Sequence, residues 1–200
     1  FKGYDFNAKM QKLLQSVRDG ETDVVRALVE TDKKLCDATY GPSRNTALHY
    51  AALHGRTETL KHLLSQSKQM PRNTIGWTPL MCALWSGNEG CALACLLSHL
   101  KGDEQTKLAD GANCFHLAAV APTPQSALIL FALQESGVDI NAQLNTHPNN
   151  TPLHLAVLAR KVETIRVLVQ LGANKNKVNK DHESPVDLAM KIGSQAIIQT

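Results

Sequence analysis

Residues 150–176 read NTPLHLAVLARKVETIRVLVQLGANKN, and this segment carries the clearest structural signal in the chain. Thr151 is a good N-cap, and Pro152 suits the first helical position because proline has no amide hydrogen and a fixed helical φ. Apolar residues recur at helical spacing over 153–158 and again, after a short turn, over 162–171. Gly172 can adopt the left-handed conformation that ends many helices. The segment therefore predicts two short helices followed by a polar loop.

Copies of this segment occur along the chain. Equivalent openings, T-A-L-H, T-P-L-M, N-C-F-H and S-P-V-D, begin at residues 46, 78, 113 and 184, so consecutive openings lie 32 to 38 residues apart. Two such helices cannot bury their apolar faces alone, so neighbouring copies are expected to stack. The T-P-L-H opening and the G-A-x-x-N exit closely resemble the ankyrin repeat, whose length is about 33 residues. The resemblance implies an all-α ankyrin-repeat solenoid of stacked helix–turn–helix units with finger loops.

Six units account for nearly the whole chain, which we interpret as a single ankyrin-repeat domain over 1–200. The expected repeats are a capping unit at 8–40, then 41–73, 74–108, 109–146 and 147–179, and a partial unit at 180–200. Because the chain ends where the last repeat should form its second helix, we expect a fragment of a longer protein.

The first and fourth repeats depart from the pattern. The capping unit lacks the T-P-L-H opening, and we expect Asp5 or Asn7 to cap its first helix. Its polar residues are interpreted as the solvent-facing side of a terminal repeat, and these are Lys9, Gln11, Lys12, Arg18 and Glu21. In the fourth repeat A-P-T-P at 121–124 replaces the usual glycine turn, so Thr123 is expected to cap a helix over 124–136. This longer turn either bends the stack or carries a contact.

The composition indicates an ordinary soluble protein, with 43% hydrophobic and 20% charged residues. A net charge of +3 is too small to indicate a nucleic-acid partner. No apolar run approaches the roughly 18 residues that a membrane helix needs, and the N-terminus does not resemble a signal peptide. We therefore expect neither nucleic-acid binding nor membrane insertion.

Five cysteines are scattered over expected helices and loops, which disfavours a disulfide framework and favours a reducing compartment. We expect a cytoplasmic protein, with a nuclear protein or a secreted effector in a host cytosol as alternatives. Cys91, Cys95 and His99 fall at i, i+4 and i+8 on one helix. A metal-dependent module is an alternative for this reason, but zinc sites normally use four ligands with close-spaced pairs, so we expect no metal and no cofactor.

Three histidines recur at the same repeat position, at His49, His116 and His154. The resemblance implies that each hydrogen-bonds nearby backbone and fixes a repeat turn, rather than serving catalysis. Paired carboxylates, a phosphate-binding glycine loop and H-E-x-x-H are all missing from the sequence. We therefore expect a chain that is not an enzyme.

The resemblance also implies where a partner binds. Ankyrin repeats use their finger loops and the exposed face of their first helices, which together form a concave groove. The exposed eighth position of successive openings holds Leu53, Trp85, Val120, Leu158 and Lys191, and the position before the openings includes Asn45, Trp77, Asn150 and Glu183. Tryptophan is enriched among residues that dominate interface energy, and a contiguous apolar strip usually marks a contact site. The alternative is that the two tryptophans pack on each other and only stiffen the stack.

We predict a protein–protein interaction module whose groove binds a partner through eight residues: Trp85, Trp77, Leu53, Val120 and Leu158, with Tyr40, Ile75 and His147 on the fingers at its edge. The alternative is a substrate-targeting domain of a larger enzyme, or of a host-directed bacterial effector, whose catalytic region lies outside this chain.

One further motif concerns modification. Leu133, five residues and then Asp139-Ile140-Asn141 match the pattern L-x5-(D/E)-(V/I)-N, which resembles the target of the asparaginyl hydroxylase that modifies ankyrin repeats. Asn141 is the expected site. The alternative is that this triplet is only the structural consensus of a repeat exit. In the next repeat, Asn174 and Lys175 replace the acidic and apolar residues, so Asn176 matches less well.

Overall fold

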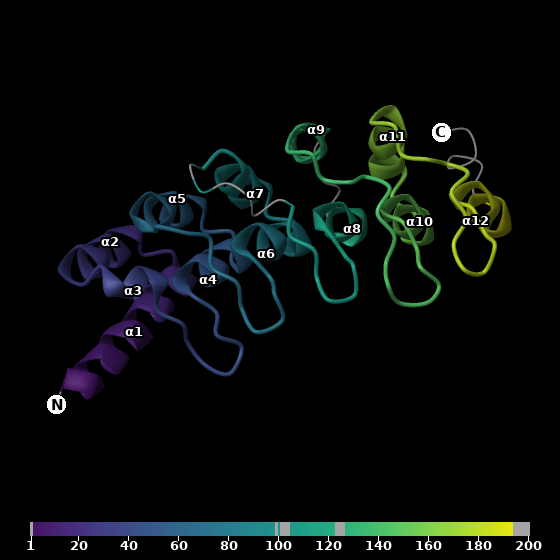
Figure 1. Cartoon of the computed structure of the whole chain (residues 1–200). Helices are drawn as coiled ribbons and strands as arrows, with labels where there is room; N and C mark the ends of the chain where they lie inside the picture. The colour runs from purple at the N-terminus through teal and green to yellow at the C-terminus, as the bar shows by residue number, and fades with distance from the viewer. Residues whose placement is uncertain (1, 99, 101–104, 123–126, 194–200) are drawn as a thin grey trace. The chain divides into compact units, whose positions relative to one another are not determined.

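The computed structural model describes residues 2–98, 100, 105–122 and 127–193 (Figure 1). Within these ranges the regular structure is helical, and the only β-type pairing is an isolated bridge between Tyr40 and Asn45. The all-α prediction is therefore confirmed. The chain divides into two compact units, Phe1–Asp103 and Glu104–Thr200. The assignment of one domain over 1–200 stays a prediction.

Unit 1 contains two layers of helices. First helices α1 (Lys2–Asp19), α4 (Ala47–Leu53) and α6 (Pro79–Ser86) pack in one layer. Second helices α2 (Thr22–Thr31), α5 (Thr57–Gln66) and α7 (Glu89–Leu96) form the other layer, and short α3 (Lys34–Asp37) joins α2 to the first finger loop (Figure 1). The core between the layers is aliphatic, and its fully buried side chains include Leu13, Leu48, Leu60, Leu80 and Leu84. Burial of these side chains holds the repeats together.

Unit 2 repeats the plan. First helices α8 (Cys114–Val120), α10 (Pro152–Leu158) and α12 (Pro185–Ile192) form one layer, and second helices α9 (Ala127–Glu135) and α11 (Val162–Gln170) pack on its other side (Figure 1). Phe115, Ile129, Leu130 and Leu168 are fully buried in this unit.

Helix starts occur at the openings that the sequence predicts. Capping boxes begin four first helices, in which an N-cap side chain and the side chain three residues later bond to each other's backbone; the N-caps are Thr46, Asn113, Thr151 and Ser184. Thr78 caps α6 by accepting a hydrogen bond from the Met81 N–H at 3.3 Å. Each cap satisfies amide groups that the first turn leaves unpaired.

The N-terminal helix differs from expectation. It begins at Lys2, so Asp5 and Asn7 lie inside α1 and the prediction that one of them caps it is wrong. Asp5 Oδ2 lies 2.8 Å from Lys9 Nζ, and this i,i+4 pair supports a continuous helix. In the fourth repeat, the expected cap Thr123 and the start at Pro124 lie outside the described residues, as does the second helix of the last repeat.

Candidate partner-binding surfaces

The structure places five of the predicted contact residues in unit 1. Leu53 ends α4, Trp85 lies on α6, Trp77 precedes α6, and Tyr40 and Ile75 lie on the two finger loops. Trp85 is 49% exposed and Ile75 is 64% exposed, Tyr40 is exposed, and Leu53 and Trp77 are half-buried. We call these five residues the tryptophan surface.

The two tryptophans of this surface pack on each other. Their ring centroids lie 5.6 Å apart in an edge-to-face arrangement with an interplanar angle of 69°. Such pairs add to stability beyond the area that they bury. The stiffening contact that the sequence allowed is therefore present, yet half of the Trp85 side chain remains open to solvent. The packing orients the ring without covering it.

Polar contacts hold the finger loops in place. The Asn73 Oδ1 atom accepts hydrogen bonds from the N–H groups of Ile75 at 3.1 Å and Trp77 at 2.9 Å. Its Nδ2 atom donates to Asn45 Oδ1 at 3.0 Å on the preceding finger, and the Thr74 N–H donates to the Ser43 carbonyl at 3.0 Å. Because these contacts already order the loops, a partner that docked on them would cause a smaller loss of conformational entropy.

The other three predicted contact residues lie in unit 2. Leu158 at the end of α10 is 49% exposed, Val120 at the end of α8 is half-buried, and His147 on a finger loop is exposed. The His147 Nε2 atom lies 3.1 Å from Asp181 Oδ1 on the next finger. We call Val120, His147 and Leu158 the leucine surface. It is smaller than the tryptophan surface and contains no tryptophan.

The residue before each opening is not always exposed. Asn150 is buried, and its Oδ1 atom accepts a hydrogen bond from Asn179 Nδ2 at 3.0 Å. This contact repeats the Asn45–Asn73 pairing of unit 1. Glu183, at the same position, pairs with Lys191 on α12. Asparagine at this position links consecutive finger loops, and only Trp77 contributes an aromatic ring to a surface.

A small hollow in unit 1 was missed by the sequence reasoning. It has a volume of about 200 Å³ and is lined by Gln11, Leu14, Gln15, Arg18, Tyr40 and Tyr50. Gln11 and Arg18 were interpreted as ordinary surface of a capping repeat, whereas Tyr40 from the first finger and Tyr50 from α4 complete a hollow with them. We call it the arginine pocket. No motif links residues that far apart in the chain.

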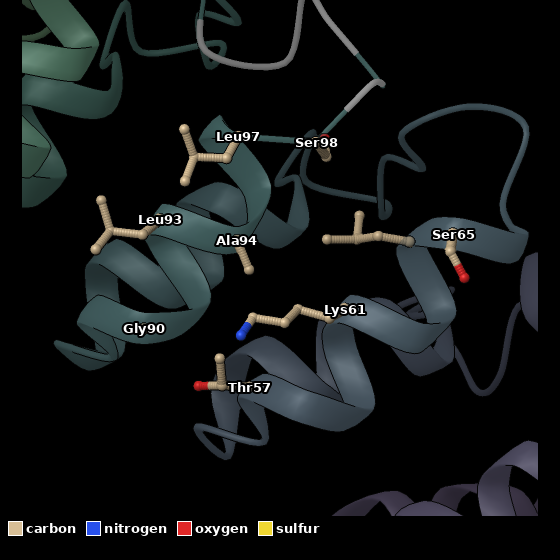
Figure 2. A pocket seen from close by; sticks show the side chains of 9 residues that line it. Thr57, Lys61, Ser65, Gly90, Leu93, Ala94, Leu97 and Ser98 are labelled. Atoms are coloured by element: carbon tan, nitrogen blue, oxygen red, sulfur yellow. The ribbon is translucent and has the colours of Figure 1, made fainter.

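A larger groove of about 520 Å³ lies between the second helices α5 and α7 (Figure 2). Leu64, Leu93, Ala94 and Leu97 give it an apolar lining, and the Leu97 side chain is 81% exposed. Lys61 also lines the groove (Figure 2), and its Nζ atom lies 2.8 Å from Glu58 Oε1 on the same helix. This groove belongs to the layer opposite the first helices, and none of the predicted contact residues lines it.

The three recurrent histidines are buried and structural. In His49 the Nδ1 atom accepts a hydrogen bond from the Thr46 N–H at 3.1 Å, so the proton is on Nε2, which donates to the Trp77 carbonyl at 2.9 Å. His154 makes the same contacts with Thr151 and with the Glu183 carbonyl. Burial lowers the pKa of both rings. Each histidine is thus a neutral link between its helix start and the next finger.

His116 has the same role in unit 2. Its Nδ1 atom accepts from the Asn113 N–H at 3.2 Å, and Nε2 lies 3.3 Å from the Asn150 carbonyl oxygen. Burial lowers its pKa to about 4. A ring held by one donor and one acceptor is neutral and has no lone pair left for a substrate proton. These contacts give the histidine of the recurrent opening a role in folding.

The cysteines that are described are buried thiols. Burial, together with the nearby Asp37 carboxylate, raises the pKa of Cys36 to about 11, and burial raises that of Cys91. A nucleophilic cysteine needs the opposite shift. Within the described ranges, no group of three His, Cys, Asp or Glu side chains is placed to hold a metal ion, while His99 lies outside them.

Asn141 lies on the exit loop after α9. Its N–H donates to Asp139 Oδ1 at 2.9 Å, its Oδ1 atom accepts from the Asn174 N–H at 2.8 Å, and its carbonyl accepts from Lys177 Nζ at 2.8 Å. Leu133, the first residue of the motif, is fully buried. The side chain of Asn141 therefore links two exit loops, as the structural consensus requires.

Comparison with known proteins agrees with this architecture. The family model for ankyrin repeats, described as three copies, matches residues 13–107 and 115–200. A probable E3 ubiquitin-protein ligase XBOS32 from Oryza sativa subsp. japonica is 26% identical over 91% of this chain and 42% of its own length. A putative palmitoyltransferase ZDHHC13 from Danio rerio is 25% identical over 88% of this chain and 33% of its own length. The chain thus spans less than half of either relative.

The fold has a close counterpart among solved structures. The crystal structure of an ankyrin repeat domain from Acinetobacter baumannii superimposes with a TM-score of 0.76 and 20% identity, and the match covers 94% of both chains. Across the residues that the structure describes, no helix is both long and apolar enough to cross a bilayer. The family match covers most of the sequence, and the helix pairs, caps and finger loops are those expected from it. The chain therefore belongs to the ankyrin-repeat family, whose repeats are protein-interaction modules.

Proposed function

We propose that this chain binds a partner protein through the side formed by its first helices and finger loops, which is concave in the family. The observation that carries the proposal is the tryptophan surface. Trp85 is half exposed, and its ring lies edge-to-face against Trp77, whose N–H group is held by Asn73. An exposed and oriented indole of this kind resembles the aromatic anchors that dominate interface energies. The leucine surface contributes a second contact from unit 2.

The comparisons support a role in binding and leave the chemistry to other segments. The two relatives named above are enzymes of different kinds, a ubiquitin ligase and a palmitoyltransferase, and this chain matches less than half of each. A region shared between unrelated chemistries suits recognition better than catalysis. We propose that the chain has no catalytic activity of its own. The alternative, a targeting domain for a catalytic region encoded outside these residues, uses the same surface and predicts an enzymatic domain in the flanking gene sequence.

The test compares Trp85→Ala with a matched control, Leu97→Ala. Both changes remove a large exposed apolar side chain from unit 1, but Trp85 belongs to the first-helix layer and Leu97 lines the α5–α7 groove. Each immobilised variant is incubated with cell lysate, and captured proteins are quantified by mass spectrometry after far-UV circular dichroism shows equal helicity.

We expect Trp85→Ala to capture at least about tenfold less of a partner that Leu97→Ala still captures. Truncating a dominant contact residue costs about 2 kcal/mol or more of binding free energy. The reverse pattern, with loss in Leu97→Ala only, would assign binding to the groove of Figure 2 and contradict the proposal. Equal capture by both variants would contradict it as well.

We further propose that Asn141 is a substrate of an asparaginyl hydroxylase when unit 2 opens locally. The motif supports this, and the contact between Asn141 Oδ1 and the Asn174 N–H explains why opening is required. Incubation with the purified hydroxylase, molecular oxygen as the oxidant and the reducing co-substrate that takes up the second oxygen atom should convert one C–H bond of Asn141 to C–OH. The peptide containing Asn141 should then gain one oxygen atom, and the peptide containing Asn176 should gain none. The yield should rise in variants that destabilise unit 2. An unmodified Asn141 in both the folded and the destabilised chain would refute the proposal.

A further inference from the structure

We propose that the arginine pocket takes an aspartate or glutamate side chain of the partner protein, while an apolar side chain of the same segment contacts the tryptophan surface. This inference rests on the proposed function and specifies the chemistry of the partner. Its recognition residues include Arg18 and Tyr50, for which the sequence predicts no role in binding.

The lining of the pocket is rich in donors and contains no carboxylate. Arg18, one of the lining residues, carries a guanidinium group with five N–H donors and no acceptor, and Tyr40 and Tyr50, which also line the pocket, each carry a hydroxyl group. The nearest acid along α1, Asp19, accepts a hydrogen bond from Gln15 Nε2 at 2.8 Å. Charge-assisted bonds from arginine to a carboxylate are among the strongest in proteins. The pocket therefore complements an anion.

A second guanidinium group, that of Arg56, lies at the same end of α1. The Arg56 guanidinium donates through Nε, at 3.0 Å, and Nη2, at 2.5 Å, to the carbonyl oxygen of Arg18, which fixes the end of α1. Burial lowers the pKa of nearby His54, and Arg18 and Arg56 lower it further. Arg18 and Arg56 would therefore both attract a carboxylate of the partner, while the nearby Asp19 carboxylate is bonded to Gln15.

The volume favours a side chain over a free metabolite. Pockets for drug-sized ligands generally measure about 300–1,000 Å³, whereas this one measures about 200 Å³. A carboxylate on a short aliphatic stem fits such a space and can remain attached to a chain that continues along the surface. A free ligand of this size would lack the apolar contacts that supply most small-molecule affinity.

The pocket continues into the tryptophan surface. Tyr40 belongs to both, and Tyr50 precedes Leu53 by three residues on α4, so these two side chains are neighbours on one helix face. Helix α4 packs between α1, which carries Arg18, and α6, which carries Trp85 (Figure 1). One extended segment can therefore contact both, and arginine and tryptophan are the residue types most enriched among dominant contacts.

The test selects random peptides displayed on phage against the whole immobilised chain. We expect the selected peptides to carry Asp or Glu at a fixed spacing from an aromatic or aliphatic residue. One winning peptide is then synthesised, and its affinity is measured for the wild-type chain and for Arg18→Glu, Trp85→Ala and Arg26→Glu. Arg26 is exposed on α2, in the second-helix layer, so Arg26→Glu is a control with the same change of charge.

We expect Arg18→Glu to weaken binding at least about tenfold and Arg26→Glu to leave it within about twofold, because a hydrogen-bonded charge pair is lost only in the first. Replacing the acidic residue of the peptide by lysine should restore binding to Arg18→Glu. Selected peptides without an acidic residue, or equal effects of the two arginine variants, would overturn this inference. The proposed function would still be supported if Trp85→Ala weakened binding. Insensitivity to Trp85→Ala, or a selection without winners, would overturn both.

Discussion

Acidification should destabilise this protein through its neutral buried histidines, and His116 allows the effect to be calculated. Its pKa is about 4 in the folded chain, against 6.5 for an ordinary histidine. The folded pKa is depressed, so the unfolded chain binds more protons between these values and the stability falls as the pH falls. The contribution of His116 is complete above pH 6.5 and is lost progressively down to about pH 4.

The loss of unfolding free energy can be estimated from the difference between the pH and the pKa of His116 in the unfolded chain. A pH of 5 is about 1.5 units below the pKa of 6.5 in the unfolded chain, so the unfolded imidazole is mostly protonated. The ring in the folded chain is still mostly neutral at this pH. At about 1.4 kcal/mol per unit, His116 alone lowers the free energy of unfolding by about 2 kcal/mol between pH 7 and pH 5. His49 and His154 act in the same direction because burial lowers their pKa values too.

The assay is urea denaturation at pH 7 and pH 5, followed by far-UV circular dichroism, for the wild-type chain and for His116→Gln. Glutamine does not titrate, so between pH 7 and pH 5 the free energy of unfolding should fall by about 2 kcal/mol less in the variant than in the wild type. The control is His182→Asn, which removes an exposed histidine from a position with φ of 60°, where asparagine is tolerated. If His116→Gln and the wild type lose equal stability, the neutral-link account of this histidine is wrong.

Three further predictions test the packing and the caps. Gly90→Ala should lower the free energy of unfolding by about 1 kcal/mol despite the better helix propensity of alanine, because the new Cβ would lie 2.8 Å from Thr57 Oγ1. Adding Thr57→Ala to the same chain should recover part of this free energy, as measured by urea denaturation. Thr151→Ala should cost about 1 kcal/mol in the same assay, since it removes the cap of α10 and the hydroxyl contact to His154 Nδ1 at 2.7 Å. Cys36 should resist iodoacetamide near pH 8 until urea unfolds the chain, as peptide mass spectrometry can show, because its raised pKa and burial keep the thiol protonated and covered.

The fold could be predicted because its signals are local. A threonine, a proline and a histidine within four residues are enough to start α10, and their contacts in the structure lie within that turn or reach one carbonyl of the next finger. The same local chemistry identified α4, α8 and α12 even where asparagine or serine replaces threonine. Residue identity at such positions is informative because the backbone needs those groups whatever the neighbours are.

The arginine pocket could not be predicted because its parts lie on three separate elements. Gln11 and Arg18 belong to α1, Tyr40 to a finger loop and Tyr50 to α4, so their proximity depends on how α1 rotates against α4. The capping repeat has no T-P-L-H opening that would fix this register. Periodicity identifies the apolar face of α1 but does not show which polar residues beside that face meet the finger loop.

The hydrogen bonds separate side chains that build the repeat from side chains available to a partner. The polar atoms of His49 and Asn73 form hydrogen bonds with a helix cap and with neighbouring finger loops. A substitution at either residue would therefore destabilise the fold. Trp85 and Arg18 are different, since both residues are exposed at the surface of unit 1. A surface whose members can be altered without removing a cap or a finger contact is where one scaffold can acquire a particular partner. By this criterion we propose that the specificity of unit 1 resides in the tryptophan surface and the arginine pocket, while His49 and Asn73 hold the loop that carries Trp77.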